Sequence, residues 1–415
     1  MTFKRVVVTG MGALTPIGNT VTEYWQGLVN GVSGCAPITK FDAEKFRTRF
    51  ACEIKGFDVN NFIPRQEARK MDPFTQYAIV AADEAIKDSG LDLDKINKNK
   101  VGVIWGSGIG GLKTFEEEMI YFGKGDGTPK INPFFIPKMI ADSASGQISI
   151  RHGFRGPNYV TVSACSSANN AIIDAFNYIR LGRINVCVSG GSEAAVTIAS
   201  VGGFTAMRAM SERNDDPSTA SRPYDKDRDG FVVGEGAGSI ILEEYEHAKA
   251  RGARIYAELI GGGFSSDAYH ITAPHPEGYG ALLSMQDALE DANIKPEEVD
   301  YINTHGTSTP IGDPQELKAI VDLFGEHAYK MNISSTKSMT GHLLGGAGAI
   351  EAVASILALE HQIVPPTINC FTPDPEIDSK LNLTFNKAQN REMNIVLSNG
   401  FGFGGHNATV IFRKI

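Results

Sequence analysis

Hydrophobic and polar positions alternate along the chain in two patterns. Short apolar runs bounded by glycine, such as 4–9, 101–105 and 185–189, have the length and composition of buried strands. Segments 75–88 and 169–180 instead carry apolar residues at helical spacing. Strands that alternate with helices in this way predict an α/β fold.

The pattern starts again near residue 254. The segment IYAELIGGGFSSD resembles the opening VVVTGMGALTP, and DYINTHGTSTPIGD stands where VGVIWGSGIGG stood in the first part. Internal similarity of this kind indicates a duplicated fold. We therefore expect two pseudo-symmetric halves, residues 1–253 and 254–415.

A third pair of segments points to the centre of the molecule. NYVTVSACSSANNAIIDAFNYIRLG has the pattern of strand, tight turn and helix, and NISSTKSMTGHLLGGAGAIEAVASILALE repeats it. Helices whose faces carry small residues can approach each other closely, and both segments carry such residues: Ala168, Ala171 and Ala175 in the first, Gly345, Gly348, Ala349 and Ala352 in the second. We predict a buried central helix pair whose N-terminal ends carry Cys165 and the loop of His342.

Composition narrows the class of protein. The 415 residues are 42% hydrophobic and 21% charged, and no apolar stretch approaches the roughly 18 residues of a membrane helix. The N-terminal apolar run is too short for a secretion signal. Five scattered cysteines indicate a reducing compartment without zinc. A net charge of -9 disfavours nucleic acid. We expect a soluble, cytoplasmic protein with no bound metal and no nucleic-acid or membrane partner.

Two familiar motifs are present but lack their context. GSGIGG at 106–111 matches a dinucleotide-binding pattern, yet no acidic strand end follows at the required distance, so we expect these glycines to allow close packing or to line a pocket. DKDRDG at 225–230 begins like a calcium loop, but Gly236 stands where the bidentate glutamate belongs. We interpret it as a charged surface turn with internal Asp/Arg pairing.

The candidate nucleophile is Cys165. It lies between a predicted strand and the start of a long helix, where the helix dipole and free N–H groups favour a thiolate. The four other cysteines lack this context, and we expect them to be small buried hydrophobic residues.

His305, in NTHGTSTP, and His342, in SMTGHLLGGAG, complete the predicted site. Each alone is as well explained as a histidine that bonds to turn backbone. A cysteine-histidine pair is typical of hydrolases and transferases, but two histidines without an acidic partner suit another task, which is to donate to a developing oxyanion. Decarboxylation of a malonyl thioester generates such an enolate.

A glycine-rich loop near the C-terminus, LSNGFGFGGHNA, carries Phe401 and Phe403. Its amides can complete an oxyanion hole, and its glycines would let a phenylalanine move as a gate. The alternative is a hairpin turn with aromatic anchors. We leave His406 of this loop outside the catalytic set.

Four motifs in order, VSACSSAN, NTHGTSTPIGD, STKSMTGHLLGGAGAIEA and SNGFGFGGHN, closely resemble the β-ketoacyl-[acyl carrier protein] synthases of the thiolase-like superfamily, in particular the type II elongating enzymes. The resemblance covers essentially the whole chain. It implies a five-layered α-β-α-β-α fold, a homodimer, an acyl carrier protein as partner and no cofactor on the enzyme, since the carrier supplies the phosphopantetheine arm.

The resemblance also assigns roles to individual residues. Cys165 would accept the acyl chain, His305 and His342 would promote decarboxylation, and the amides of Cys165 and Phe403 would form the oxyanion hole. The supporting set comprises Lys337 and Glu351 around His342, Thr304 and Thr307 on the pantetheine arm, Phe401 and Phe403 as gate, and Ile109 and Phe204 in the acyl pocket. Gly400 and His406 replace the serine and threonine common in bacterial relatives.

Because the carrier protein is acidic, docking would need local positive charge on this acidic chain. The candidates are Arg65, Arg69, Lys70, Lys130 and Arg208. Without the resemblance, such a cluster is typical of a solvated face.

Three alternatives share part of this pattern. A polyketide-type ketosynthase would use the same chemistry on another chain. A thiolase acting on coenzyme A would need a second cysteine in the C-terminal loop, where Phe403 to His406 offer none. A non-catalytic chain-length partner would not need Cys165, His305 and His342 together.

Overall fold

The computed structural model describes residues 3–415, so the first two residues of the expected N-terminal half lie outside the described part. Ten strands form one hydrogen-bonded sheet in the order β10-β9-β13-β14-β8-β1-β7-β6-β4-β5. The N-terminal half contributes β1 (Val6–Leu14), β4 (Val101–Gly106), β5 (Asn158–Thr161), β6 (Val186–Glu193) and β7 (Gly236–Glu244). The C-terminal half contributes β8 (Ala257–Ser266), β9 (Tyr301–Asn303), β10 (Asn332–Ser334), β13 (Ile395–Gly402) and β14 (His406–Arg413).

The sheet has an internal symmetry. Antiparallel pairing of Val6 with Leu259 and of Val8 with Ala257 joins β1 to β8. Outward from this join, the N-terminal half runs β1-β7-β6-β4-β5 and the C-terminal half runs β8-β14-β13-β9-β10. The two orders match strand for strand, which explains why the hydrophobic pattern starts again near residue 254.

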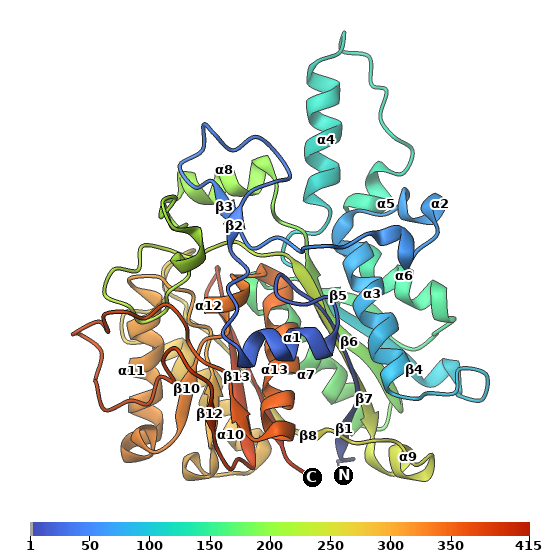
Figure 1. Ribbon diagram of the computed structural model, residues 1–415. Coiled ribbons are helices and arrows are strands. Elements are labelled where there is room, and N and C mark those ends of the chain that lie inside the picture. Colours follow the sequence, from blue (N-terminus) through green and yellow to red (C-terminus); the bar gives the residue numbers. More distant parts are fainter. Residues whose placement is uncertain (1–2) are drawn as a thin grey trace.

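Helices cover and separate the two halves (Figure 1). The central helices α7 (Ser167–Arg180) and α13 (Ala347–His361) contact each other and strands of both halves. On the outer faces lie α3 (Pro73–Asp88) and α6 (Ser143–His152) against the first half, and α10 (Tyr279–Ala292) and α11 (Gly312–Phe324) against the second. These are the five layers that the resemblance implies.

Close packing of the central pair depends on small residues, as the pattern predicts. Residues 347–359 of α13 are all buried. A Cβ on Gly348 would lie 1.6 Å from the Asn169 side-chain oxygen of α7, so no larger residue fits there. The neighbouring GSGIGG segment also packs closely, because a Cβ on Gly106 would lie 2.5 Å from the Ala168 nitrogen.

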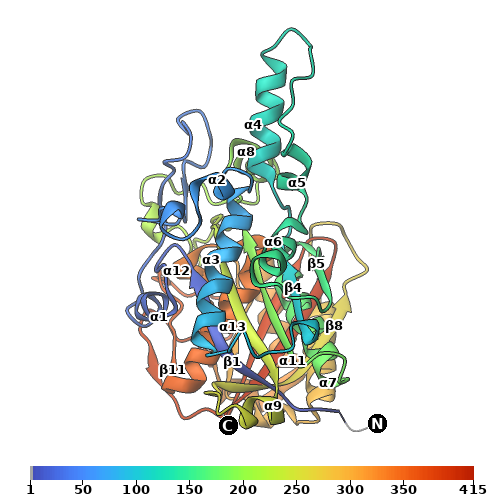
Figure 2. The same ribbon diagram turned by 90° about the vertical axis from the view of Figure 1, so that its right-hand side faces the viewer.

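Smaller elements build the rim. Figures 1 and 2 show α4 and the loop after it projecting from the body. The remaining elements are the helices α1 (Val21–Val29), α2 (Arg65–Ala68), α4 (Leu112–Gly123), α5 (Phe135–Met139), α8 (Ile198–Ala206), α9 (Tyr245–Ala250) and α12 (Lys337–Thr340), and the short strands β2 (Ala36–Pro37), β3 (Phe50–Ala51), β11 (Ile363–Val364) and β12 (Gln389–Asn390). Within residues 3–415, no helix has the length and apolar character needed to cross a bilayer.

One sequence interpretation needs a partial correction here. In the charged turn 225–230, Lys226, Asp227 and Asp229 are exposed as expected, but Asp225 and Arg228 are buried. The Arg228 guanidinium lies 2.6 Å from a carboxylate oxygen of Asp374 and 3.5 Å from one of Asp313. Opposite charges paired in this way explain how the Arg228 side chain can be buried.

Candidate active site

Cys165 lies in a single helical turn, Ala164–Ser166, that leads into α7. The equivalent turn of the other half, Leu344–Gly346, leads into α13. Ala164 and Leu344 both have left-handed backbones, with φ of 51° and 48°. Non-glycine residues are rare in this region. The duplicated fold therefore has the same strained entry to both central helices, with Cys165 in one half matched by Gly345 in the other.

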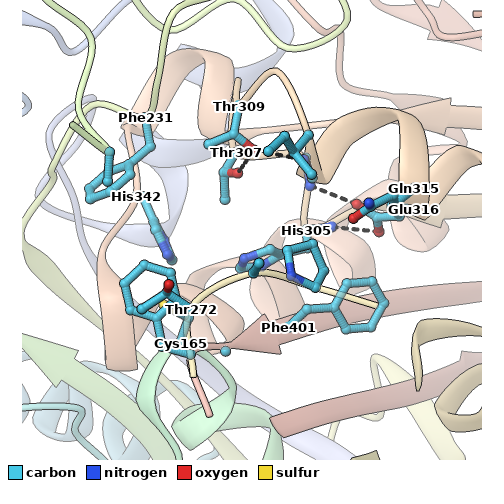
Figure 3. A pocket seen from close by; sticks show the side chains of 18 of the residues that line it. Cys165, Phe231, Thr272, His305, Thr307, Thr309, Gln315, Glu316, His342 and Phe401 are labelled. Atoms are coloured by element: carbon cyan, nitrogen blue, oxygen red, sulfur yellow. Dashed lines mark hydrogen bonds between the residues drawn. The ribbon is translucent and has the colours of Figure 1, made fainter. Parts of the chain in front are cut away.

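The three predicted catalytic side chains meet in one cavity of about 430 Å³. Cys165 comes from the N-terminal half, and His305 and His342 come from the C-terminal half. The two imidazole centroids are 5.2 Å apart, and the rings are nearly perpendicular at 85°. Figure 3 shows both rings directed toward the space beside Cys165.

The charge state of Cys165 differs from the sequence expectation. Burial raises the pKa of its thiol to about 12, although the Lys337 charge and the Phe403 N–H act in the opposite direction. Desolvation therefore outweighs the Lys337 charge and the Phe403 N–H, and Cys165 is a thiol at neutral pH instead of the expected thiolate. The sulfur has to lose its proton as it reacts.

Both histidines are neutral in this environment. Burial lowers the pKa of His305 and of His342 well below 6.5, and the positive charge of Lys337 lowers both further. Neither Nδ1 atom has a hydrogen-bond partner among the described residues. A neutral imidazole can accept one proton and donate one N–H, so the pair can serve both as base and as donor.

A buried ion pair supports the histidines from behind. The Lys337 ammonium of α12 bonds to the Glu351 carboxylate of α13, and both side chains are 1% exposed. Burial raises the pKa of Glu351, and Lys337 opposes that shift. The pair thus places a positive charge close enough to influence Cys165, His305 and His342 together.

Two buried carboxylates that sequence reasoning missed hold the loops of the site. Glu316 of α11 accepts the backbone N–H groups of His305 and Gly306, both at 2.8 Å, and the Asn399 amide at 3.0 Å. Burial raises its pKa. The only signal for Glu316 in the sequence was an acidic residue in the helix that follows NTHGTSTP. The sequence does not distinguish such a buried acceptor from an exposed helical glutamate.

Glu193, the last residue of β6, joins the two halves. Its carboxylate accepts the N–H of Gly108 at 2.7 Å, the N–H of Gly345 at 3.0 Å and the Ser107 hydroxyl at 3.1 Å. Burial raises its pKa to about 7. The backbones it joins are so close that a Cβ on Gly345 would lie 2.1 Å from the Gly108 nitrogen.

The C-terminal loop closes one side of the cavity. The Phe403 N–H faces the Cys165 sulfur. The Phe401 ring lies 5.8 Å from the His305 ring, centroid to centroid, and Phe204 also lines the cavity. The aromatic loop is therefore in contact with the reacting groups. His406 is exposed and is not among the residues that line the cavity.

Two expected substrate contacts are placed differently. Thr304 is fully buried away from the cavity, with its hydroxyl paired with the Tyr224 hydroxyl at 2.6 Å and donating to the Ser334 carbonyl at 3.1 Å. Thr307 does line the cavity, and so does Thr309, which sequence reasoning missed; their hydroxyls are 3.1 Å apart. Ile109 does not line the cavity in this chain and is 40% exposed.

The candidate docking residues lie on the rim. Arg65, Arg69 and Lys70 are exposed on and beside α2, and the Lys70 ammonium lies 5.6 Å from the Phe134 ring centre. Arg208 is exposed and lines the mouth of the cavity. Lys130 is exposed on the loop that follows α4. The elements that carry these residues, which are α2, the loop after α4 and the end of α8, lie at one end of the molecule (Figure 1).

Comparison with known proteins matches this architecture. Residues 3–248 match the family model "Beta-ketoacyl synthase, N-terminal domain" and residues 256–371 match "Beta-ketoacyl synthase, C-terminal domain". The chain belongs to the beta-ketoacyl synthase family. It is 52% identical over 414 residues to 3-oxoacyl-[acyl-carrier-protein] synthase 2 of Synechocystis, a match that covers 99% of this chain and 98% of the relative.

Solved structures of beta-ketoacyl synthases share the fold. A beta-ketoacyl synthase from Burkholderia phymatum superposes with a TM-score of 0.92 at 36% identity and covers 99% of this chain and all of that one. A type II polyketide ketosynthase, solved with its acyl-carrier protein, superposes with a TM-score of 0.91 at 34% identity over the full length of both chains. The predicted family, fold and condensing activity are confirmed, with the fatty-acid type favoured over the polyketide type.

Proposed function

We propose that this beta-ketoacyl synthase elongates acyl chains carried as thioesters: Cys165 holds the growing chain, and His305 and His342 act on the malonyl group. The observation that carries the assignment of residues is the convergence of one thiol and two neutral imidazoles in a single 430 Å³ cavity. The chemistry needs no bound cofactor, because these side chains and backbone amides supply every group used below.

In the first half-reaction the acyl chain moves to the enzyme. Because the thiol pKa is about 12, the Cys165 proton passes to a neutral imidazole as the sulfur attacks the thioester carbonyl. The N–H groups of Cys165 and Phe403 receive the negative charge that develops on the carbonyl oxygen. Collapse of the tetrahedral intermediate expels the carrier thiolate, which takes up the proton.

In the second half-reaction a malonyl thioester replaces the released carrier. Its carboxylate leaves as carbon dioxide, and the electron pair of the broken bond forms an enolate whose oxygen accepts N–H bonds from His305 and His342. The enolate carbon then attacks the Cys165 thioester, so a carbon-carbon bond forms and the carbon-sulfur bond breaks. The Cys165 thiolate takes up a proton from solvent, since its original proton left with the carrier thiol, and a β-ketoacyl thioester leaves.

An acyl carrier protein is the proposed donor of both substrates. The polyketide ketosynthase of similar fold was solved with its acyl-carrier protein. On this chain, Arg208 at the cavity mouth and the cluster of Arg65, Arg69 and Lys70 supply local positive charge for an acidic carrier. Thr307 and Thr309, which line the cavity, are placed to bond the amides of a pantetheine arm.

A homodimer is the proposed assembly. Strand β5 is one of the two edge strands of the sheet, and an uncovered edge is available for pairing with another chain. An exposed apolar side chain directly follows β5, since Val162 is 63% exposed. A second copy on this face would cover Val162 together with Ile109, which would place Ile109 at the border of an acyl pocket.

Acyl loading tests the chemistry directly. The protein is incubated with acyl-carrier thioesters of increasing chain length, and covalent loading is followed by intact-protein mass spectrometry. We expect Cys165→Ala to abolish this loading. His305→Ala and His342→Ala should lose malonyl decarboxylation while some acyl loading persists. Loading of the wild-type protein reports which chain lengths are accepted. Formation of β-ketoacyl product by the Cys165→Ala protein would contradict the mechanism.

Charge reversal tests the carrier surface. Arg69→Glu with Lys70→Glu should reduce turnover with carrier-bound thioesters at least tenfold more than turnover with small pantetheine thioesters, because a small thioester does not touch the rim. Lys387→Glu, an exposed lysine on another part of the surface, is the matched control. Equal losses on both substrates would remove these residues from the docking surface.

A further inference from the structure

Two of the five cysteines face each other. Cys35 directly precedes β2, and Cys52 directly follows β3. The antiparallel register pairs Ala36 with Ala51, so its continuation by one residue sets Cys35 opposite Cys52. Opposed residues in such a pair have Cα atoms about 4.5–5.5 Å apart, within the range of about 4.4–6.8 Å that a disulfide requires. Their sulfur atoms are in contact at 2.7 Å.

The pair lies next to the backbone segment that holds His342. The Cys52 N–H donates to the Val233 carbonyl at 2.9 Å. The same segment holds His342 from both sides: the His342 N–H donates to the Val232 carbonyl at 2.7 Å, and the His342 carbonyl accepts the Gly234 N–H at 2.9 Å. The backbone of residues 232–234 therefore connects Cys52 to His342 through hydrogen bonds.

A second connection leads to the helix of Lys337. The N–H of Gly34, next to Cys35, donates to the Met339 carbonyl of α12 at 2.7 Å. A Cβ on Gly341 would lie 2.8 Å from the Cys52 sulfur, so this sulfur packs against the turn between α12 and His342. The hairpin loop between the two cysteines carries Phe41 and Phe46, which pack on the apolar cluster that includes Cys165.

We propose that Cys35 and Cys52 form a redox modification site at which a hydroperoxide is the oxidant and an intrachain disulfide is the product. The disulfide would fix the 36–51 hairpin against the backbone segment that holds His342. Cys35 is 6% exposed and Cys52 is fully buried, so the peroxide reaches Cys35 first. The Cys35 thiol reduces the peroxide, becoming a sulfenic acid and releasing water. The Cys52 sulfur then attacks the Cys35 sulfur, and a second water leaves. Two thiols and one hydrogen peroxide thus give one disulfide and two waters.

Closure has a physical consequence that can be measured. A disulfide across a loop of about 15 residues restricts the unfolded chain by about 3 kcal/mol. With about 2.1 cal/mol/K of unfolding entropy per residue, the 415 residues give about 0.9 kcal/mol/K, so oxidation should raise the midpoint of thermal unfolding by about 3 °C.

The experiment uses the full-length chain with Cys165→Ala, so that peroxide cannot act on the nucleophile. After hydrogen peroxide treatment, alkylation of free thiols and tryptic digestion without reductant, we expect peptides 6–40 and 50–55 joined, with the mass of two hydrogens lost. Dithiothreitol should separate them. Added Cys35→Ala should abolish the link and the thermal shift, whereas added Cys370→Ala, which removes another buried cysteine, should keep both.

Three results would overturn the proposal. Alkylation of Cys35 and Cys52 as separate thiols after peroxide treatment would show that the site does not close. Linkage of Cys35 to another cysteine or to a second chain would assign a different pair. The same thermal shift in the Cys35→Ala protein would place its cause elsewhere.

Discussion

The buried Lys337–Glu351 pair offers a quantitative test of how the site is held. In Lys337→Met the side chain keeps its approximate length and loses its charge. Both partners are 1% exposed, and Glu351 Oε2 has no hydrogen-bond partner within residues 3–415. Loss of the ammonium therefore strands a buried carboxylate, which costs about 3–5 kcal/mol. Protonation of Glu351, whose pKa burial already raises, limits the cost to the lower part of that range.

The expected change in unfolding temperature follows from chain size. An unfolding entropy of about 2.1 cal/mol/K for each of 415 residues gives about 0.9 kcal/mol/K for the chain. A loss of about 3–5 kcal/mol in the free energy of unfolding therefore lowers the midpoint by about 3–6 °C. Scanning calorimetry of Lys337→Met, Glu351→Gln and the double variant measures it. The double variant strands no charge, so it should recover most of the loss.

The same substitution should change the pH dependence of acyl loading. Lys337 lowers the pKa of His305 and His342, so its removal lets both rings protonate at higher pH, and a protonated ring cannot accept the Cys165 proton. The acidic limb of the loading rate, followed by intact-protein mass, should therefore move to higher pH. An unchanged limb, or a double variant whose stability loss equals the sum of the singles, would refute the reasoning.

Three further predictions concern the backbone and the titrating groups. Gly345→Ala places a Cβ 2.1 Å from the Gly108 nitrogen and should lower the free energy of unfolding in urea by about 1–3 kcal/mol or more. The control is Gly123→Ala, whose Cβ would meet nothing within 4 Å and should be neutral or stabilise by up to about 1 kcal/mol. Equal effects of the two substitutions would contradict the close packing at Gly345. Glu316→Ala releases the His305 and Gly306 N–H groups and should slow decarboxylation about 100-fold, with KM for the carrier thioester unchanged; a rate near wild type would remove Glu316 as a positioning residue. His305 and His342 have folded pKa values below 6.5, so below pH 6.5 the unfolded chain binds more protons than the folded chain. The free energy of unfolding should therefore fall as pH falls, by up to about 1.4 kcal/mol per pH unit for each histidine. When urea unfolding is measured against pH, the His305→Asn/His342→Asn variant should lack this pH dependence.

Strand and helix positions were largely readable from the sequence, with errors where packing extends an element. The pattern predicted helices over 75–88 and 169–180, and the structure has α3 at Pro73–Asp88 and α7 at Ser167–Arg180. The first strand was expected to end at Thr9, yet β1 continues to Leu14. It continues because Gly10 and Gly12 lie flat against α3, where a Cβ on Gly12 would meet the Ala81 carbonyl at 1.9 Å.

The sequence by itself predicted the duplicated α/β plan, the small-residue central helices and the candidate set of Cys165, His305 and His342, because periodicity and local motifs are properties of neighbouring residues. Tertiary structure alone decided which charges are buried and which side chains face the cavity. It turned the expected thiolate into a thiol with raised pKa, replaced Thr304 by Thr309 in the cavity wall, and enlisted Glu193 and Glu316 as acceptors for loop N–H groups. Desolvation and side-chain direction depend on what packs around a residue from distant parts of the chain, and no local pattern records that.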